Sequence, residues 1–102
     1  MSGDNPLAWQ PPASDGGSEI FNYLIEYRAE GEFKWKKAND EHVAQTSYVI
    51  KRLKEGAMYE FRVAAENKAG VGPYSDPTQP IKCKAPVGKI SLKVYFHINL
   101  DI

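Results

Sequence analysis

The side chains that most often carry catalysis or bind metals are few in this 102-residue sequence and lie far apart. The histidines are His42 and His97, and neither has a cysteine or a carboxylate at ligand spacing, so both are interpreted as solvated side chains. Cys83 is the single cysteine, which excludes an internal disulfide and a zinc site built from cysteines. It is in phase with Ile81, a pattern typical of a small buried hydrophobic residue. We therefore expect no metal centre.

The serines and the glycine-rich segments do not match a catalytic or phosphate-binding pattern either. Residues 70–73, Gly-Val-Gly-Pro, are not a phosphate loop, because no helical pattern follows to supply amides and a dipole. Asp15-Gly16-Gly17 lacks the further carboxylates that a calcium site needs. The serines, none of which has the context of a nucleophile elbow, are Ser14, Ser18, Ser47, Ser75 and Ser91. The sequence therefore predicts that the protein is not an enzyme and has no cofactor.

Composition sets further limits on function. Apolar residues make up 42% and charged residues 25% of the chain, as is ordinary for a globular domain, and the formal net charge is zero. A neutral chain has no field that favours nucleic acid or an anionic membrane, so neither is expected as a partner. The first residues lack the features of a signal peptide, and no Asn-x-Ser/Thr site occurs. With one cysteine, this favours a cytoplasmic location, with an extracellular one as the alternative.

The elements that must position any site are predicted to be strands. From Tyr59 to Glu66, aromatic and aliphatic residues alternate with mainly polar ones, which is typical of a strand with one buried face. A turn follows at residues 70–73. Similar short patterns, separated by turn residues, occur at residues 7–9, 20–28, 33–36, 46–50 and 78–84. Residues 38–45 are polar and are expected to be irregular. Short strands at this spacing, with no helical period, predict a β-sandwich.

Several short motifs follow one another between residues 7 and 86. They are Trp9-Gln10-Pro11-Pro12, Asp15-Gly16-Gly17-Ser18, Tyr23-Leu24-Ile25-Glu26-Tyr27-Arg28, Trp35, Leu53-x-Glu-Gly-x-x-Tyr59-Glu-Phe-Arg-Val and Ala65-Glu66-Asn67-x-Ala69-Gly70-x-Gly72. In this order and at this spacing they resemble a fibronectin type III domain. The sequences of the two loops are most similar to those in domains of the giant sarcomeric proteins of the titin and twitchin type.

The resemblance implies an all-β, immunoglobulin-like sandwich with strands A-B-E packed against C′-C-F-G. It also implies a tyrosine corner, in which the Tyr59 hydroxyl returns to the backbone near Leu53. The residues expected in the structural core are Trp9, Tyr23, Ile25, Tyr27, Trp35, Tyr48, Ile50, Leu53, Tyr59, Phe61, Val63, Ile81 and Cys83.

The function that follows is a non-enzymatic structural and protein-interaction module of a multidomain sarcomeric or cytoskeletal protein. The alternative is an ectodomain module of an adhesion receptor. Outward charges on strand C, Glu26 and Arg28, are expected beside Glu60 and Arg62 on strand F. Docking is expected at two loops of one pole, through Asp15, Gly16, Gly17, Asn67, Lys68, Gly70, Gly72 and Tyr74.

The two ends of the chain depart from the family pattern. Residues 1–6 are poor strand formers and read as an N-terminal remnant, so strand A is expected to be largely missing before the domain at residues 7–86. Residues 87–102 are an added amphipathic strand, with apolar residues at Ile90, Leu92, Val94, Phe96, Ile98 and Leu100. This strand could pair with strand G or run parallel to strand B. It could also enter the vacant strand A position of a neighbour in a swapped homodimer, or be a remnant of engineering or truncation.

Overall fold

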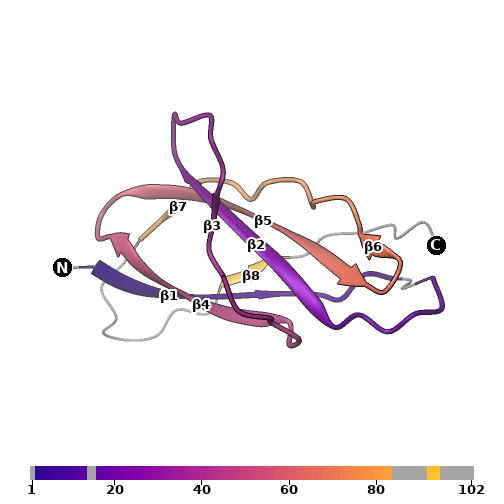
Figure 1. The fold of residues 1–102 in the computed structure, drawn as a ribbon. Coiled ribbons are helices and arrows are strands. Elements are labelled where there is room, and N and C mark those ends of the chain that lie inside the picture. Colours follow the sequence, from indigo (N-terminus) through magenta and orange to yellow (C-terminus); the bar gives the residue numbers. More distant parts are fainter. Residues whose placement is uncertain (1, 14–15, 84–91, 95–102) are drawn as a thin grey trace.

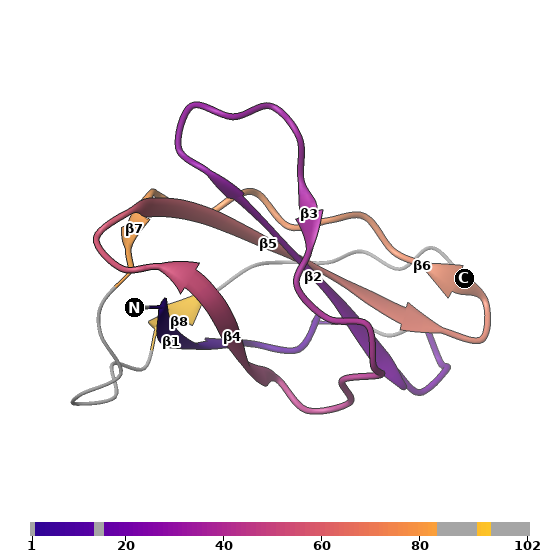
Figure 2. The same ribbon diagram turned by 60° about the vertical axis from the view of Figure 1, so that its left-hand side comes forward.

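The computed structural model describes residues 2–13, 16–83 and 92–94, and every regular element in these ranges is a β-strand. The strands are β1 (Ser2–Trp9), β2 (Asn22–Ala29), β3 (Lys36–Lys37), β4 (Ser47–Lys54), β5 (Met58–Asn67), β6 (Gly70–Val71), β7 (Ile81–Lys82) and β8 (Leu92–Val94). One sheet has the order β4-β1-β8 and the other the order β3-β2-β5-β6, with β7 also on β5. Figures 1 and 2 show the sheets as two layers, which confirms the all-β sandwich.

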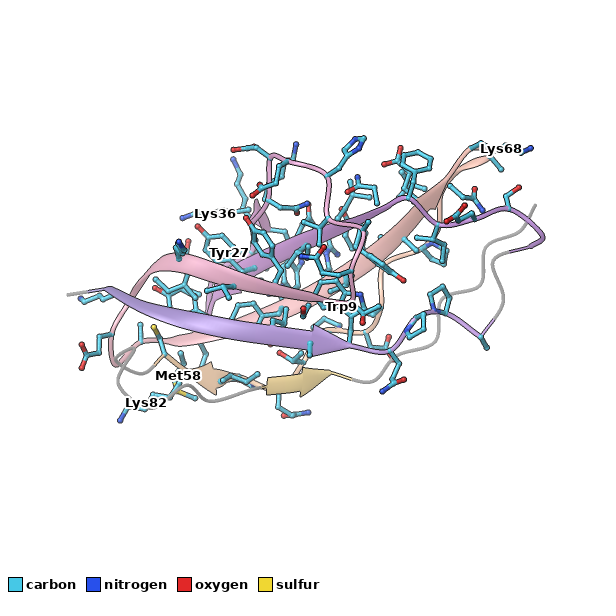
Figure 3. All side chains as sticks on the ribbon, turned by 90° about the horizontal axis from the view of Figure 1, so that it is seen from below. Trp9, Tyr27, Lys36, Met58, Lys68 and Lys82 are labelled. Carbon is cyan, nitrogen blue, oxygen red and sulfur yellow. The ribbon has the colours of Figure 1, made fainter. Side chains whose placement is uncertain are left out.

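The long central pair of the larger sheet is β2 and β5, which are antiparallel and in register from Asn22↔Glu66 to Ala29↔Tyr59. Their odd-numbered residues face the other sheet, where Phe61 and Val63 are almost completely buried. The smaller sheet supplies Leu7 and Trp9 from β1 to the same core. Trp9, one of these core residues, is labelled in Figure 3.

The first strand begins earlier than the sequence predicted. Residues 1–6 were expected to be a remnant without strand structure, but β1 starts at Ser2 and pairs antiparallel with β4 from Ser2↔Lys54 onward. The ladder changes register between Gly3 and Asn5, which accommodates poor strand formers in a bulge. Pairing with β4 therefore overrides weak local propensity. β1 carries Trp9 and is the first strand among the described residues.

The segment after β2 also differs from the prediction. A strand was expected at residues 33–36 with Trp35 in the core, but β3 consists only of Lys36–Lys37. Phe33 is 93% exposed, and Trp35 lies outside the core cluster. The reason is the register of the β2–β3 pair, in which Tyr27 pairs with Lys36. Because the strands are antiparallel, Trp35, which precedes Lys36, comes opposite Arg28, which follows Tyr27. Arg28 faces outward, and residues opposite each other lie on the same face of a sheet, so Trp35 faces outward too.

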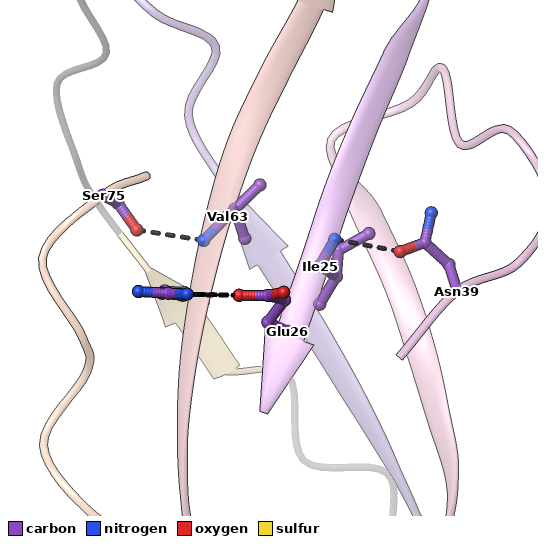
Figure 4. A network of polar contacts seen from close by, with 6 residues as sticks. Ile25, Glu26, Asn39, Val63 and Ser75 are labelled. Atoms are coloured by element: carbon purple, nitrogen blue, oxygen red, sulfur yellow. Dashed lines mark hydrogen bonds and ion pairs between the residues drawn. The ribbon is translucent and has the colours of Figure 1, made fainter. Parts of the chain in front are cut away.

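The segment that borders β5 on its far side is only partly a regular strand. A weak strand was predicted at residues 78–84, whereas β7 is limited to Ile81–Lys82. Hydroxyl groups take over part of the ladder: the Val63 amide donates to Ser75 Oγ at 3.1 Å, and the Phe61 amide donates to Thr78 Oγ1 at 3.1 Å. Figure 4 shows the Ser75–Val63 bond. Prolines in this stretch prevent a continuous ladder, and these hydroxyls keep buried β5 amides paired.

Candidate functional site

The turn between β4 and β5 is closed by a tyrosine hydroxyl. The Lys54 backbone amide donates a 2.9 Å hydrogen bond to Tyr59 Oη, and Tyr59 as a whole is only 9% exposed. Gly56 adopts a φ of 87°, a left-handed conformation that favours glycine, and its amide donates to the Cys83 carbonyl. The tyrosine corner implied by the sequence is therefore present, and it joins β4, β5 and the end of β7 at one pole.

The outer face of the larger sheet carries a stack of alternating aromatic and guanidinium groups, which we call the stacked face. Its members are Arg28, Trp35, Arg62 and Tyr74. The Cζ atoms of Arg28 and Arg62 each lie 4.4 Å from the centroid of the Trp35 ring, and Arg62 Cζ lies 4.3 Å from the Tyr74 ring. Cation–π contacts of this length are attractive. The stack therefore links β2, β5, the approach to β3 and the segment after β6.

Carboxylates complete the stacked face. Arg28 Nε lies 2.8 Å from Glu60 Oε1, and Arg62 Nη2 lies 2.6 Å from Glu26 Oε1, each across the β2–β5 ladder. These are the charge pairs expected from the sequence. Glu26 appears in Figure 4 on β2, opposite β5. Since every cation here has an acidic partner and an aromatic neighbour, the face is close to neutral and its side chains are held in fixed positions.

Burial and charge both act on the phenol at the end of this stack. Burial raises the pKa of Tyr74, and the negative charge of Glu26 raises it further, while the positive charge of Arg62 opposes them. Tyr74 therefore remains a neutral phenol at physiological pH. It stacks on Arg62 as an uncharged ring, while Glu26 is the ion-pair partner of Arg62. Burial also raises the pKa of Tyr23 in the core.

The two loops expected to dock a partner do lie at one pole. Asn67 Nδ2 donates to the Ser18 carbonyl at 3.5 Å, and the Phe21 amide donates to the Glu66 carbonyl, so both loops meet at the end of β5. Of the predicted docking residues, Gly16, Gly17, Lys68 and Gly70 are exposed, Gly72 and Tyr74 are half-buried, and Asp15 lies outside the described residues. Asn67 is only 2% exposed, so it is a poor contact residue. Its Oδ1 accepts the Ala69 amide and braces the turn.

Sequence reasoning missed a set of buried polar side chains that hold the 38–45 segment against β2. Asn39 accepts the Ile25 amide at 2.9 Å and donates to the Tyr23 carbonyl, and Asn22 Oδ1 accepts the Val43 amide. The Ile25–Asn39 bond is drawn in Figure 4. The 38–45 segment is irregular, as predicted, but the burial of Val43, which is 2% exposed, was not foreseen. An asparagine side chain that bonds to the backbone of a strand leaves no periodic pattern in the sequence. The isolated Val43 in a polar loop is a signal that could have indicated burial of this segment.

The predicted core residues fall into three groups. Tyr27, Tyr48 and Ile81 are partly buried and pack against the core, and Trp35 belongs to the stacked face instead. Leu7, Val43 and Ala65 are core residues that the prediction left out. The predicted residues that are buried are Trp9, Tyr23, Ile25, Ile50, Leu53, Tyr59, Phe61, Val63 and Cys83.

The predicted association strand is described only in part. Leu92 and Val94 belong to β8, which pairs parallel with β1. Ile90, Phe96, Ile98 and Leu100 lie outside the described residues. In the part of the chain that the structure describes, no three His, Cys, Asp or Glu residues are grouped as metal ligands would be. That part also holds no helix with the length and hydropathy of a membrane span.

A two-layer sandwich with a tyrosine corner defines this chain as an immunoglobulin-like β-sandwich protein. Residues 3–81 match the family model for the fibronectin type III domain, and the chain belongs to that family. It is 40% identical over 79 residues to M-protein of striated muscle from Gallus gallus, covering 78% of this chain and 5% of that protein. It is 39% identical over 83 residues to fast-type myosin-binding protein C from Homo sapiens, covering 81% of this chain and 7% of that protein.

Solved structures give the same assignment. The kinase region of twitchin from C. elegans superposes with a TM-score of 0.68 at 39% identity, covering 76% of this chain and 13% of that one. Titin module A71 from human cardiac muscle superposes with a TM-score of 0.66 at 31% identity, covering 85% of this chain and 94% of that one. The chain thus corresponds to a small part of its curated relatives, which are sarcomeric muscle proteins.

Proposed function

We propose that this chain is a non-catalytic spacer and docking module of a multidomain sarcomeric protein in the cytoplasm of muscle cells. The observation that carries this proposal is its identity of about two fifths to domains of M-protein and myosin-binding protein C. A module of 102 residues that covers so little of its relatives acts through neighbours and partners rather than alone.

Two features suit the domain to a mechanical role. The tyrosine corner ties β4 to β5 at one pole, and the stacked face ties β2, β5 and the segment after β6 along the sheet. Side-chain links that cross strands add to the backbone ladder, so the strands resist separation. The function is therefore carried by the fold, without a reactive group.

The docking surface that we propose is the loop pole, with Lys68 and Val71 as exposed contact residues. Val71 on β6 is 52% exposed, and Lys68, directly after the end of β5, is exposed as well. An exposed apolar side chain and an exposed cation on the same β5–β6 hairpin suit a protein partner that offers an apolar contact and a carboxylate. Since relatives are named for binding myosin, the partner we propose is the myosin filament.

Cosedimentation with purified myosin filaments tests this proposal. We expect the wild-type chain to pellet with filaments, and we expect Lys68→Glu and Val71→Asp to weaken binding several-fold. The opposite pole supplies matched controls in Lys34→Glu and Phe33→Asp, which change an exposed cation and an exposed apolar residue there. A chain that does not bind filaments, or loses binding only through the control variants, would contradict the proposed docking surface.

Location in muscle cells is a second test. A fluorescent fusion of the chain should follow the striations of the sarcomere. Delivery to the cell surface or secretion would instead support the adhesion-receptor alternative.

A further inference from the structure

The free side of β1 is covered by a strand from the far end of the sequence. β4 pairs with one edge of β1, and β8 pairs with the other in parallel, with Leu7↔Leu92, Ala8↔Lys93 and Trp9↔Val94 as partners. The family match ends at residue 81, so β8 comes from outside the matched domain. In Figure 3 the yellow β8 ribbon lies on the side of β1 away from β4.

The register of this pair agrees with the sequence pattern on both strands. On β1, Leu7 and Trp9 are 1% and 4% exposed, whereas Ala8 between them is half-buried. In the sequence, residues 90–100 alternate with apolar residues at even positions, and the register pairs Leu92 with Leu7 and Val94 with Trp9. A slip of one residue would set Lys93 beside a core position instead. The match of the two periods indicates a specific pairing.

We propose that the edge of β1 is a strand-acceptor site and that the chain's own residues 92–94 are its occupant. An edge strand presents unpaired amides and carbonyls that can pair with an added strand. The site thus takes a short extended segment with alternating apolar residues, in the parallel direction. The domain that folds as one unit then extends past the family boundary to residue 94.

The length of the connection allows the segment to reach this site within one molecule. The Gly56 amide donates to the Cys83 carbonyl, and Ser2 pairs with Lys54, so the start of β1 and the end of β7 share a pole. From this pole to the position beside Leu7 the chain must cover about 20 Å, which is the rise of five strand residues from Ser2 to Leu7 plus the spacing between neighbouring strands. Residues 84–91 span roughly 30 Å when extended. A second copy is therefore not required to fill the site.

The experiment is a disulfide scan in a Cys83→Ala background. Ala8→Cys with Lys93→Cys joins registered partners, whose Cα atoms in neighbouring strands lie about 5 Å apart, within the range for a disulfide. The matched control, Gln10→Cys with Lys93→Cys, is two residues out of register, and its Cα atoms lie about 8 Å apart, beyond that range. We expect the registered pair to oxidise within one chain at least about ten times faster than the control.

Each outcome of the scan decides the proposal. An intrachain product from the registered pair, at a rate independent of protein concentration, supports it. An interchain product would overturn it in favour of a strand-swapped dimer. Equal rates for the registered and control pairs would overturn it by showing that this register does not persist in solution.

Hydrogen exchange on the wild-type chain tests the same pairing without any substitution, so its result does not depend on whether the cysteine variants fold. We expect the β8 amides that bond to β1 to exchange at least about a hundredfold more slowly than the same amides in an unfolded peptide. Their protection should match that of β1 and should not change on dilution. Unprotected amides at all of residues 92–94 would overturn the proposal.

Discussion

Removing the hydroxyl of Tyr59 isolates the contribution of the tyrosine corner. Tyr59→Phe keeps the ring, which lies edge-on to Tyr27 with centroids 6.0 Å apart, and deletes only the acceptor of the Lys54 amide. A buried amide that loses its acceptor costs about 1–3 kcal/mol, and water can reach this partly buried bond. We therefore expect the free energy of unfolding to fall by about 1–2 kcal/mol.

Urea unfolding followed by tryptophan fluorescence measures this loss. For a domain of this size the dependence of the unfolding free energy on urea is about 1 kcal/mol per molar, so the midpoint should fall by about 1–2 M with an unchanged slope. Tyr48→Phe is the matched control, because its hydroxyl lies 3.3 Å from its Ala38 and Glu41 acceptors in a more exposed setting. It should lower the midpoint by less than about 0.5 M. Equal midpoints for the two variants would refute the role given to Tyr59.

Three further predictions concern the stacked face and the core. Trp35→Ala should lower the free energy of unfolding by about 1–2 kcal/mol through two lost cation–π contacts, while Phe33→Ala, at a 93% exposed position, should change it by less than about 0.5. A double-mutant cycle of Glu26→Gln and Arg62→Met should give a coupling of about 0.5–1 kcal/mol that shrinks in 1 M salt; a coupling near zero would contradict the paired geometry. Burial raises the pKa of Tyr23 above its ordinary value of 10.0, so the unfolded chain loses this proton first and stability declines as pH rises above 10. Urea midpoints at pH 8 and 10.5 should show a smaller decline in Tyr23→Phe than in wild type, and equal declines would contradict this.

The fold could be predicted well from sequence because its strands carry a period of two. Phe61 and Val63 alternate with Glu60 and Arg62, and the structure buries the first pair and leaves the second on the outer face. The turn at Gly56 likewise follows from its residue type, whereas the tyrosine corner was implied by the resemblance to fibronectin type III domains. Local patterns of this kind survive folding because the sheet uses the same period.

What the sequence could not give was the register between strands. Trp35 alternates with lysines and reads as a core residue, but its face depends on pairing with β2, which sets it beside the outward-facing Arg28. The same limit applies to Asn39, whose amide replaces a neighbouring strand along β2. Both outcomes are decided by contacts between residues distant in sequence, and no single-strand period contains them.

Arg62 shows why the stacked face is better regarded as a structural device than as an open binding site. Its guanidinium forms an ion pair with Glu26 and cation–π contacts with the rings of Trp35 and Tyr74, so it already has three partners. A ligand that used this cation would have to break those contacts before gaining its own, whereas Lys68 and Val71 at the loop pole are exposed. These side chains thus stiffen the larger sheet, and the loops at its end remain the docking surface that we propose.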